Sequence, residues 1–114
     1  MTTLMAPPNQ MQTCIDVCNQ CMQACEECLS LCLKEADVQA RAHCINTLRD
    51  CADICSLASQ YMSRGSHHAK HLCNVCAAIC EACANECAKF KDQHCQQCAT
   101  VCRQCAQECR KMAQ

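Results

Sequence analysis

The chain has 114 residues, the size of one domain, and 19 of them are cysteines. Lysine and arginine number 10 and aspartate and glutamate 11, so the formal charge is −1, and the two signs are interspersed. This balance argues against a nucleic acid or an anionic membrane as a partner. Because no stretch reaches the roughly 18 uncharged residues that span a bilayer, and the N-terminus MTTLMAPPNQMQT has no apolar signal segment, we expect a cytoplasmic protein.

The composition favours long helices. The chain has one glycine and two prolines, and strong helix formers such as alanine, glutamine, glutamate and lysine are common. We therefore predict an all-α fold. The predicted order along the chain is a tail at 1–10 and then one bundle domain at 11–114, with helices at about 11–33, 37–63, 67–89 and 93–112.

Three of the four predicted helices have a boundary signal. Asn9 is a plausible N-cap for the first helix, and Asp37 is one for the second. Gly65, the only glycine, marks the end of the second helix. Asp92 suits the turn into the fourth. The connections are short, so successive helices are predicted to be antiparallel neighbours in an up-down-up-down bundle.

Every cysteine falls in one of four seams in which the spacing alternates mainly between three and four residues. The first seam comprises Cys14, Cys18, Cys21, Cys25, Cys28 and Cys32; the second Cys44, Cys51 and Cys55; the third Cys73, Cys76, Cys80, Cys83 and Cys87; and the fourth Cys95, Cys98, Cys102, Cys105 and Cys109. Leu48, Ala58 and Met62 occupy the other positions of the second seam. This is the core-facing period of packed helices, so the thiols are predicted to line the bundle axis.

A single cysteine on an apolar helix face is usually a small core residue, but nineteen in register do not fit that explanation. Structural disulfides are rare in a reducing compartment, and the odd count rules out complete pairing. Residues three or four apart on a helix also have Cβ atoms about 5–6 Å apart, whereas a disulfide requires about 3.5–4.5 Å. The pattern therefore predicts metal binding by thiols.

The identity of the metal follows from ligand softness. Thiolates select Cu(I), zinc or iron–sulfur clusters. Zinc and iron–sulfur sites use discrete sets of about four ligands, whereas Cu(I) accepts two or three thiolates, such as a C-x3-C pair on one helix face. Because each Cu(I) ion cancels one thiolate charge, we expect a capacity on the order of one Cu(I) ion per cysteine.

His43 and His94 each precede a cysteine, and the predicted topology places both at one end of the bundle. Neutral imidazole binds copper, so both are candidate entry ligands, with a solvated or capping role as the alternative for each. Met62 and Met112 belong to the opposite end. Methionine there is more often a gap-filling core residue, although its soft thioether can also bind Cu(I).

The stretches CIDVCNQCMQACEEC, CNVCAAICEACANEC and HCQQCATVCRQCAQEC resemble the bacterial four-helix-bundle copper storage proteins, in particular the cytosolic branch of that family. This resemblance covers the chain from about Met11 onward. It implies many Cu(I) ions per chain held largely by C-x3-C pairs, histidine at one bundle mouth, and a homotetramer. A copper chaperone or chelator is then the expected transient partner.

Storage and detoxification of Cu(I) in the cytoplasm is therefore the predicted function. A general zinc or cadmium buffer resembling metallothionein is the alternative, and a redox protein working through cysteine pairs is third. The chain has no phosphate-binding loop and only two aromatic residues for a substrate pocket, so no enzymatic reaction is assigned.

Overall fold

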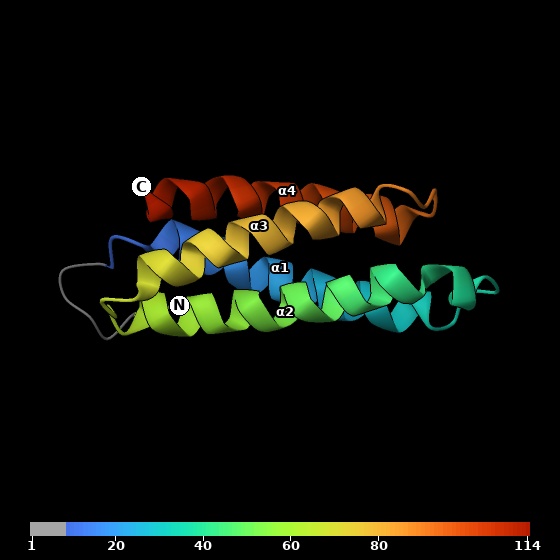
Figure 1. Cartoon of the computed structure of the whole chain (residues 1–114), viewed down its shortest axis with the longest axis horizontal. Coiled ribbons are helices and arrows are strands. Elements are labelled where there is room, and N and C mark those ends of the chain that lie inside the picture. The colour runs from blue at the N-terminus through green and yellow to red at the C-terminus, as the bar shows by residue number, and fades with distance from the viewer. Residues whose placement is uncertain (1–8) are drawn as a thin grey trace.

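The computed structural model describes residues 9–114, and in this part of the chain four long helices form an all-α bundle (Figure 1). The helices are α1 (Gln12–Cys32), α2 (Ala42–Ser63), α3 (Ala69–Cys87) and α4 (Gln93–Ala113), and a short 3-10 helix, η1 (Val38–Arg41), precedes α2. The principal extents are 49 × 26 × 17 Å. The predicted N-terminal tail lies outside the described residues except for Asn9 and Gln10.

Contacts between the helix ends define the topology. Cys14, near the start of α1, lies 3.8 Å from Cys109, near the end of α4, measured between Sγ atoms. Cys32, at the end of α1, lies 3.7 Å from Cys95, near the start of α4. These two helices are therefore antiparallel, and Figure 1 shows the alternating direction of all four helices.

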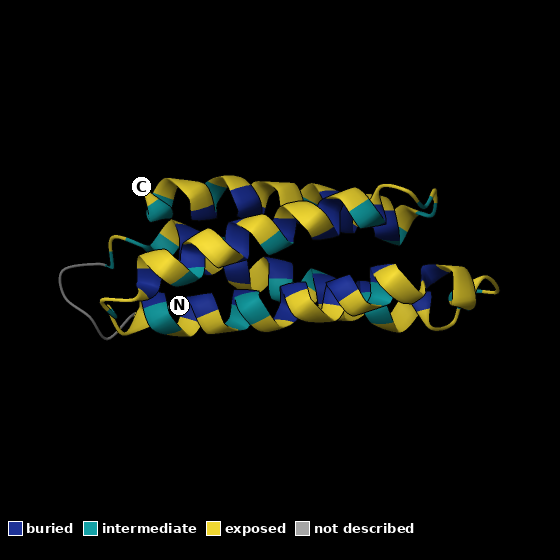
Figure 2. Ribbon diagram, viewed as in Figure 1, coloured by how far each residue is buried: buried dark blue, intermediate teal, exposed yellow. Residues whose placement is uncertain are grey.

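The core of the bundle is built largely from cysteine and alanine. Figure 2 shows the buried stripe along the inner face of each helix. Leu48 and Met62 are the largest fully buried side chains among the described residues. Partly buried aliphatic side chains such as Leu29, Ile54 and Ile79 pack against this core from its edges. The aliphatic residues thus flank the thiols.

Gly65 ends α2 in a left-handed conformation, with a φ of 63°. Its N–H donates to the Met62 carbonyl at 3.1 Å, and the Ser66 N–H donates to the Tyr61 carbonyl at 3.0 Å. These two bonds form a Schellman motif, in which a residue with positive φ lets the chain satisfy the last helix carbonyls. A glycine adopts this conformation without the steric cost that a side chain adds.

The start of α2 differs from the predicted start at residue 37. Residues 38–41 form the 3-10 helix η1, and the α-helix begins at Ala42. Asp37 and Asp92 precede η1 and α4, but neither side chain makes a capping hydrogen bond. Both carboxylates accept hydrogen bonds from Arg41 instead, because the guanidinium lies between them. The N-cap of α1 is Met11, without a side-chain capping bond, and not the predicted Asn9. The Asn9 side chain instead accepts a bond from the Met11 N–H at 2.8 Å, just before the helix.

We predict that Leu48→Ala lowers the free energy of unfolding of the reduced, metal-free protein by about 2–5 kcal/mol. Leu48 is completely buried among thiols, so its truncation leaves a cavity that small neighbours do not fill. Urea denaturation followed by circular dichroism measures the change. Leu33→Ala is the matched control, because Leu33 is 54% exposed and a surface truncation is expected within about 0.5 kcal/mol of wild type. Equal effects of the two substitutions would contradict the proposed role of Leu48 in the core.

Candidate metal centre

The nineteen cysteines all lie within the described part of the chain, and each is a free thiol that is 2% exposed or less. Neighbouring Sγ atoms from different helices lie 3.6 Å (Cys18 to Cys109) to 4.0 Å (Cys98 to Cys25) apart. A disulfide bond is about 2.05 Å long. The thiols are therefore in van der Waals and weak hydrogen-bond contact along the bundle axis.

Helix geometry explains why pairs of these thiols meet. Side chains four residues apart lie on one face, one turn above the other. Accordingly, Cys76 and Cys80 have Sγ atoms 3.7 Å apart, and Cys98 and Cys102 have Sγ atoms 3.9 Å apart. The C-x3-C spacing thus brings two sulfurs together on a single helix.

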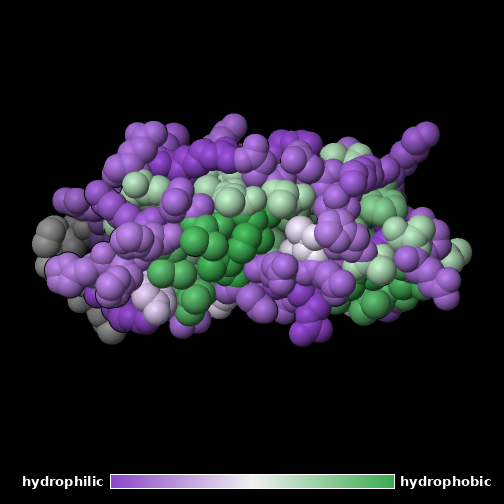
Figure 3. All heavy atoms as spheres, viewed as in Figure 1, coloured by the Kyte–Doolittle hydropathy of each residue, from purple (hydrophilic) through white to green (hydrophobic). Residues whose placement is uncertain are grey.

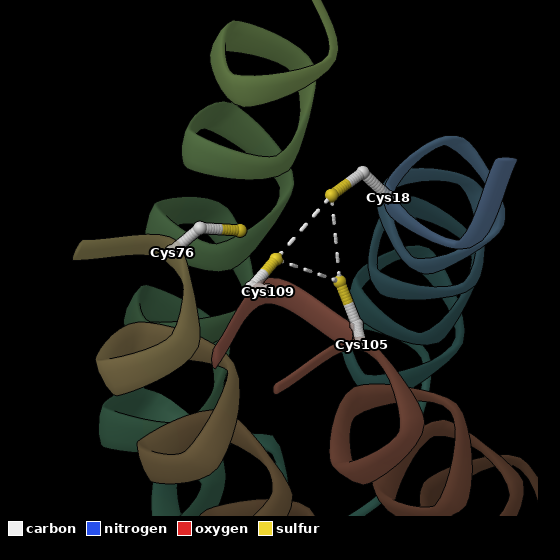
Figure 4. A group of neighbouring side chains, drawn as sticks. All are labelled: Cys18, Cys76, Cys105 and Cys109. Carbon is white, nitrogen blue, oxygen red and sulfur yellow. Dashed lines mark hydrogen bonds between the residues drawn. The ribbon is translucent and has the colours of Figure 1, made fainter. Parts of the chain in front are cut away.

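Side chains from different helices complete groups that fit a metal ion. Within each group, the candidate ligand atoms all lie within 4.8 Å of one another. Five of these groups are Cys18, Cys76, Cys105 and Cys109; Cys21, Cys55, Cys80 and Cys105; Cys21, Cys25, Cys51 and Cys102; Cys28, Cys87 and Cys98; and Cys28, Cys32, His94 and Cys95. Metal–sulfur bonds of about 2.3 Å, the length found for zinc thiolates, place two sulfurs at most about 4.6 Å apart. Figure 4 shows the first group, in which thiols of α1, α3 and α4 point toward one another.

Most successive groups share a cysteine, and the third and fourth are joined by a 4.0 Å contact between the Cys98 and Cys25 Sγ atoms. Cys105 belongs to the first two groups, Cys21 to the second and third, and Cys28 to the two at the far end. Isolated structural metal sites have their own closed sets of four ligands. Here a bridging thiolate can serve two ions, so the arrangement is a continuous column of ligands.

Protonation of the column depends on burial and on the neighbouring thiols. Contacts with other thiols, above all that of Cys105, together with burial, raise the pKa of the Cys55 thiol far above its ordinary value. Contacts of the same kind, led by that of Cys28, and burial raise the pKa of the Cys87 thiol. A buried thiolate without a counter-ion is costly, so the metal-free column keeps such thiols neutral. Binding a metal ion then releases protons.

His94 connects the column to charged groups at one end of the bundle. Its Nδ1 lies 3.4 Å from the Cys28 Sγ and 3.6 Å from the Cys95 Sγ. Its Nε2 lies 2.7 Å from an Asp92 carboxylate oxygen and 3.2 Å from one of Glu35. Because carboxylates accept hydrogen bonds, the Nε2–H donates to them, and in the neutral imidazole the Nδ1 lone pair then faces the thiols. Carboxylates orient metal-binding histidines in this way in other proteins.

The side chain of His43, the other predicted histidine ligand, points away from the thiols. Its side chain is 79% exposed, and its Nε2 lies 3.8 Å from a Glu86 carboxylate oxygen. The adjacent Cys44 points inward, with its Sγ 3.9 Å from that of Cys87. Neighbouring residues on a helix project about 100° apart, so His43 and Cys44 do not reach the same side of α2.

Arg41 is a buried cation that the sequence analysis did not identify. Its side chain is 6% exposed, it makes two hydrogen bonds to Asp92, and its guanidinium stacks 4.5 Å from the centre of the Phe90 ring. Its Nη1 also lies 3.4 Å from the Cys95 Sγ and 3.6 Å from the Cys32 Sγ. In the sequence, the one sign of a role for Arg41 is its position four residues after Asp37, and this spacing predicts only a surface ion pair. The decisive partner, Asp92, is distant in sequence.

A hollow of about 220 Å³ between α1 and α4 leads from the surface to this end of the column. His94, Cys28 and Cys98 contribute to its lining, together with apolar side chains such as Leu31 and Val101. Both cysteines are 2% exposed, the largest value for any of the nineteen thiols. An ion in solution can therefore approach the column from this side.

Comparison with known proteins places this arrangement in a family. Residues 8–114 match the family model described as copper storage protein. YhjQ, a cysteine-rich protein of Bacillus subtilis, is 46% identical over 83 residues, which cover 73% of this chain and 77% of YhjQ. The chain belongs to the copper storage protein family.

Two solved structures show how closely the fold agrees. The Cu(I)-bound copper storage protein BsCsp3 is 46% identical and superimposes with a TM-score of 0.87 over 90% of this chain and 97% of its own. A cytosolic copper storage protein from Streptomyces lividans, in a structure with five coppers, is 37% identical, with a TM-score of 0.87 over 90% of this chain and 91% of its own. The four-helix architecture is thus that of the family. Within residues 9–114, no helix is both long and apolar enough to cross a membrane.

We predict that Arg41→Met lowers the free energy of unfolding of the reduced, metal-free protein by about 1–3 kcal/mol, the cost of leaving a partly buried charged group without its partner. Urea denaturation at neutral pH measures the change. Lys89→Met is the control, because Lys89 pairs with Glu86 but is 64% exposed, and such surface pairs contribute about 0–1 kcal/mol. An Arg41 effect no larger than that of the control would show that the buried ion pair does not stabilise the bundle.

The destabilisation caused by Arg41→Met should depend on pH. The Arg41 guanidinium holds the pKa of the Asp92 carboxyl well below its usual range. The pair therefore stabilises the fold above the ordinary carboxyl pKa of about 3.9, and this contribution is lost as the pH falls from there toward the lower folded-state value. Denaturation curves recorded from neutral to acid pH should show the difference between wild type and Arg41→Met shrinking. A difference that grows on acidification would contradict this account.

Proposed function

We propose that this protein stores many Cu(I) ions in the cytoplasm and so limits their toxicity, with the thiolates of its preformed bundle as ligands. The observation that carries the proposal is the overlap of the thiol groups, in which Cys21, Cys28 and Cys105 each belong to two neighbouring groups. Bridging thiolates suit a soft monovalent ion that accepts two or three sulfurs. We assign no enzymatic reaction to this site.

Charge balance sets the proposed capacity. Each Cu(I) ion cancels the charge of one thiolate, and a buried column is most stable when it is close to neutral. We therefore propose a filling on the order of one Cu(I) ion per cysteine. BsCsp3 binds Cu(I), and the Streptomyces lividans protein holds five coppers. Both relatives support copper as the metal and several ions per chain. All nineteen cysteines are proposed ligands.

Copper is proposed to enter at the end that carries His94. The Nδ1 atom faces the Cys28 and Cys95 thiols, and the hollow between α1 and α4 reaches the same residues. We propose His94 as an entry ligand that passes Cu(I) from a chaperone or chelator to the column. The exposed side chain of His43 beside Glu86 gives that residue a weaker claim, as a surface ligand only.

We also propose that the chain forms a homotetramer in the cytoplasm. The cytosolic description of the Streptomyces lividans relative supports the location. An apolar surface on α2 and α3, visible in green near the middle of Figure 3, supports self-association. Ile54, Leu57 and Ile79 line a shallow hollow on these two helices, and Leu57 is 39% exposed. Apolar surface of this kind is typical of subunit contacts.

The proposal is tested by titrating the reduced, metal-free protein with Cu(I) under anaerobic conditions against a chromophoric chelator, with circular dichroism recorded at each addition. We expect uptake on the order of one ion per cysteine, with little change in helicity, because the thiols already face one another. A zinc-type buffer would instead saturate at about a quarter of that number, because each ion takes about four ligands. Saturation at that lower level, or folding only when metal is added, would refute the storage proposal.

A second prediction concerns one thiol pair. Cys21→Ala/Cys25→Ala should reduce Cu(I) capacity by on the order of two ions, because each missing thiolate removes one compensated charge. The variant should remain helical, since alanine is a strong helix former. Copper per chain after gel filtration, together with circular dichroism, gives both quantities. Asn19→Ala/Gln23→Ala changes the exposed face of the same helix and should leave capacity unchanged. If the cysteine variant kept full capacity, or unfolded without metal, the thiols would not be acting as preformed ligands.

A further inference from the structure

Met62 lies in the same core-facing seam of α2 as three cysteines. It follows Cys51 and Cys55 in the core-facing phase of α2, on the last turn before Gly65. Its side chain is completely buried. The Asn9 side chain donates to the Met62 carbonyl at 3.2 Å and so ties the start of the described chain to this end of α2. The Met62 sulfur therefore lies inside the bundle, at the end of the molecule opposite His94.

The nearest sulfur that contacts Met62 belongs to Cys73. The Cys73 thiol donates to the Met62 Sδ at 3.5 Å, which is shorter than the 3.6 Å separation of Cys18 and Cys109 in the column. Cys73 is itself completely buried. The thiols of Cys14, near the start of α1, and Cys109, near the end of α4, belong to the same end of the bundle, with their Sγ atoms 3.8 Å apart. Four sulfur atoms from all four helices thus gather at this end.

We propose that the Met62 Sδ and the Cys73 Sγ together bind a Cu(I) ion, forming a mixed thioether–thiolate site that ends the column. This inference rests on the proposed storage of Cu(I). A sulfur–sulfur separation of 3.5 Å is within the span of about 4.6 Å that one ion with two metal–sulfur bonds covers. Thioethers and thiolates are both soft ligands that select Cu(I).

The charge of this site differs from that of the rest of the column. One Cu(I) ion, one thiolate and one neutral thioether sum to zero, whereas one Cu(I) ion between two thiolates carries a charge of −1. A neutral site is cheaper to bury than a charged one. With methionine as the second ligand at the end of the column, the last thiolate is neutralised by its own Cu(I) ion. No further ion is needed beyond it to balance the charge.

Methionine also fills irregular core space, so a packing role predicts the same buried position without any bond to copper. The two roles differ in one observable, which is a direct bond between copper and the methionine sulfur. Replacement of sulfur by selenium makes this bond visible. We therefore label the whole chain with selenomethionine, load it anaerobically with Cu(I), and record X-ray absorption fine structure at the selenium edge.

The expected result is scattering from copper at bonding distance to selenium in the loaded protein, its loss in Met62→Leu, and its retention in Met22→Leu. Met22 is the matched control because it packs at the edge of the core, outside the cysteine seams. Leucine replaces methionine with little change in volume, so Met62→Leu should fold. A third variant, Met5→Leu/Met11→Leu/Met22→Leu/Met112→Leu, leaves only Met62 and the first residue, Met1, of the six methionines. It should retain the signal even if Met62→Leu proves unstable.

Absence of selenium–copper scattering in the loaded, labelled protein would overturn the inference, as would its persistence in a folded Met62→Leu variant or its loss in the variant with four substitutions. The copper content of the same samples separates this failure from failure of the storage proposal. Uptake on the order of one ion per cysteine without selenium–copper scattering would refute the Met62 site alone. Uptake of only a few ions would refute storage itself.

Discussion

The structure depends on contact between short side chains across the axis of a helical bundle. A thiol reaches its neighbours at 3.6–4.0 Å only if the helices pack closely. Buried alanines beside the seams, such as Ala77 and Ala84 on α3 and Ala99 and Ala106 on α4, leave room for that approach. A cysteine also buries less apolar area than a leucine. The partly buried aliphatic side chains at the edges and the buried Leu48 therefore contribute a large share of the hydrophobic stabilisation.

The periodic part of this arrangement could be predicted from the sequence. Alternation of three and four residues places every cysteine on one face of its helix, and the short connections then bring the four faces together. The histidines show the limit of such reasoning. His43 and His94 have the same local sequence context, each one residue before a cysteine, yet only His94 reaches the thiols. The outcome depends on Asp92 and Glu35, which hold the His94 ring from outside. Such contacts between segments leave no periodic signal in the sequence.

The two ends of the column differ in their chemistry. At one end, the buried Arg41 guanidinium lies against the Cys32 and Cys95 thiols and is held by Asp92. Stacking on Phe90 covers the face of the guanidinium and adds a cation–π attraction. The opposite end has a neutral thioether, from Met62, in the corresponding position beside the thiols. One end of the column therefore has a permanent positive charge beside its thiols, whereas the ligand beside Cys73 at the other end, Met62, is neutral.

The sharing of cysteines between neighbouring groups has a kinetic consequence. An ion bound among Cys18, Cys76, Cys105 and Cys109 already holds, in Cys105, one ligand of the adjoining group. It can move to that group by exchanging its other ligands one at a time, without ever losing all of its bonds to sulfur. Migration between groups that share a cysteine is then a series of small barriers, while escape to solvent requires every bond to break. A partly filled protein would accordingly hold a mobile, equilibrating population of ions rather than a fixed pattern of full and empty sites.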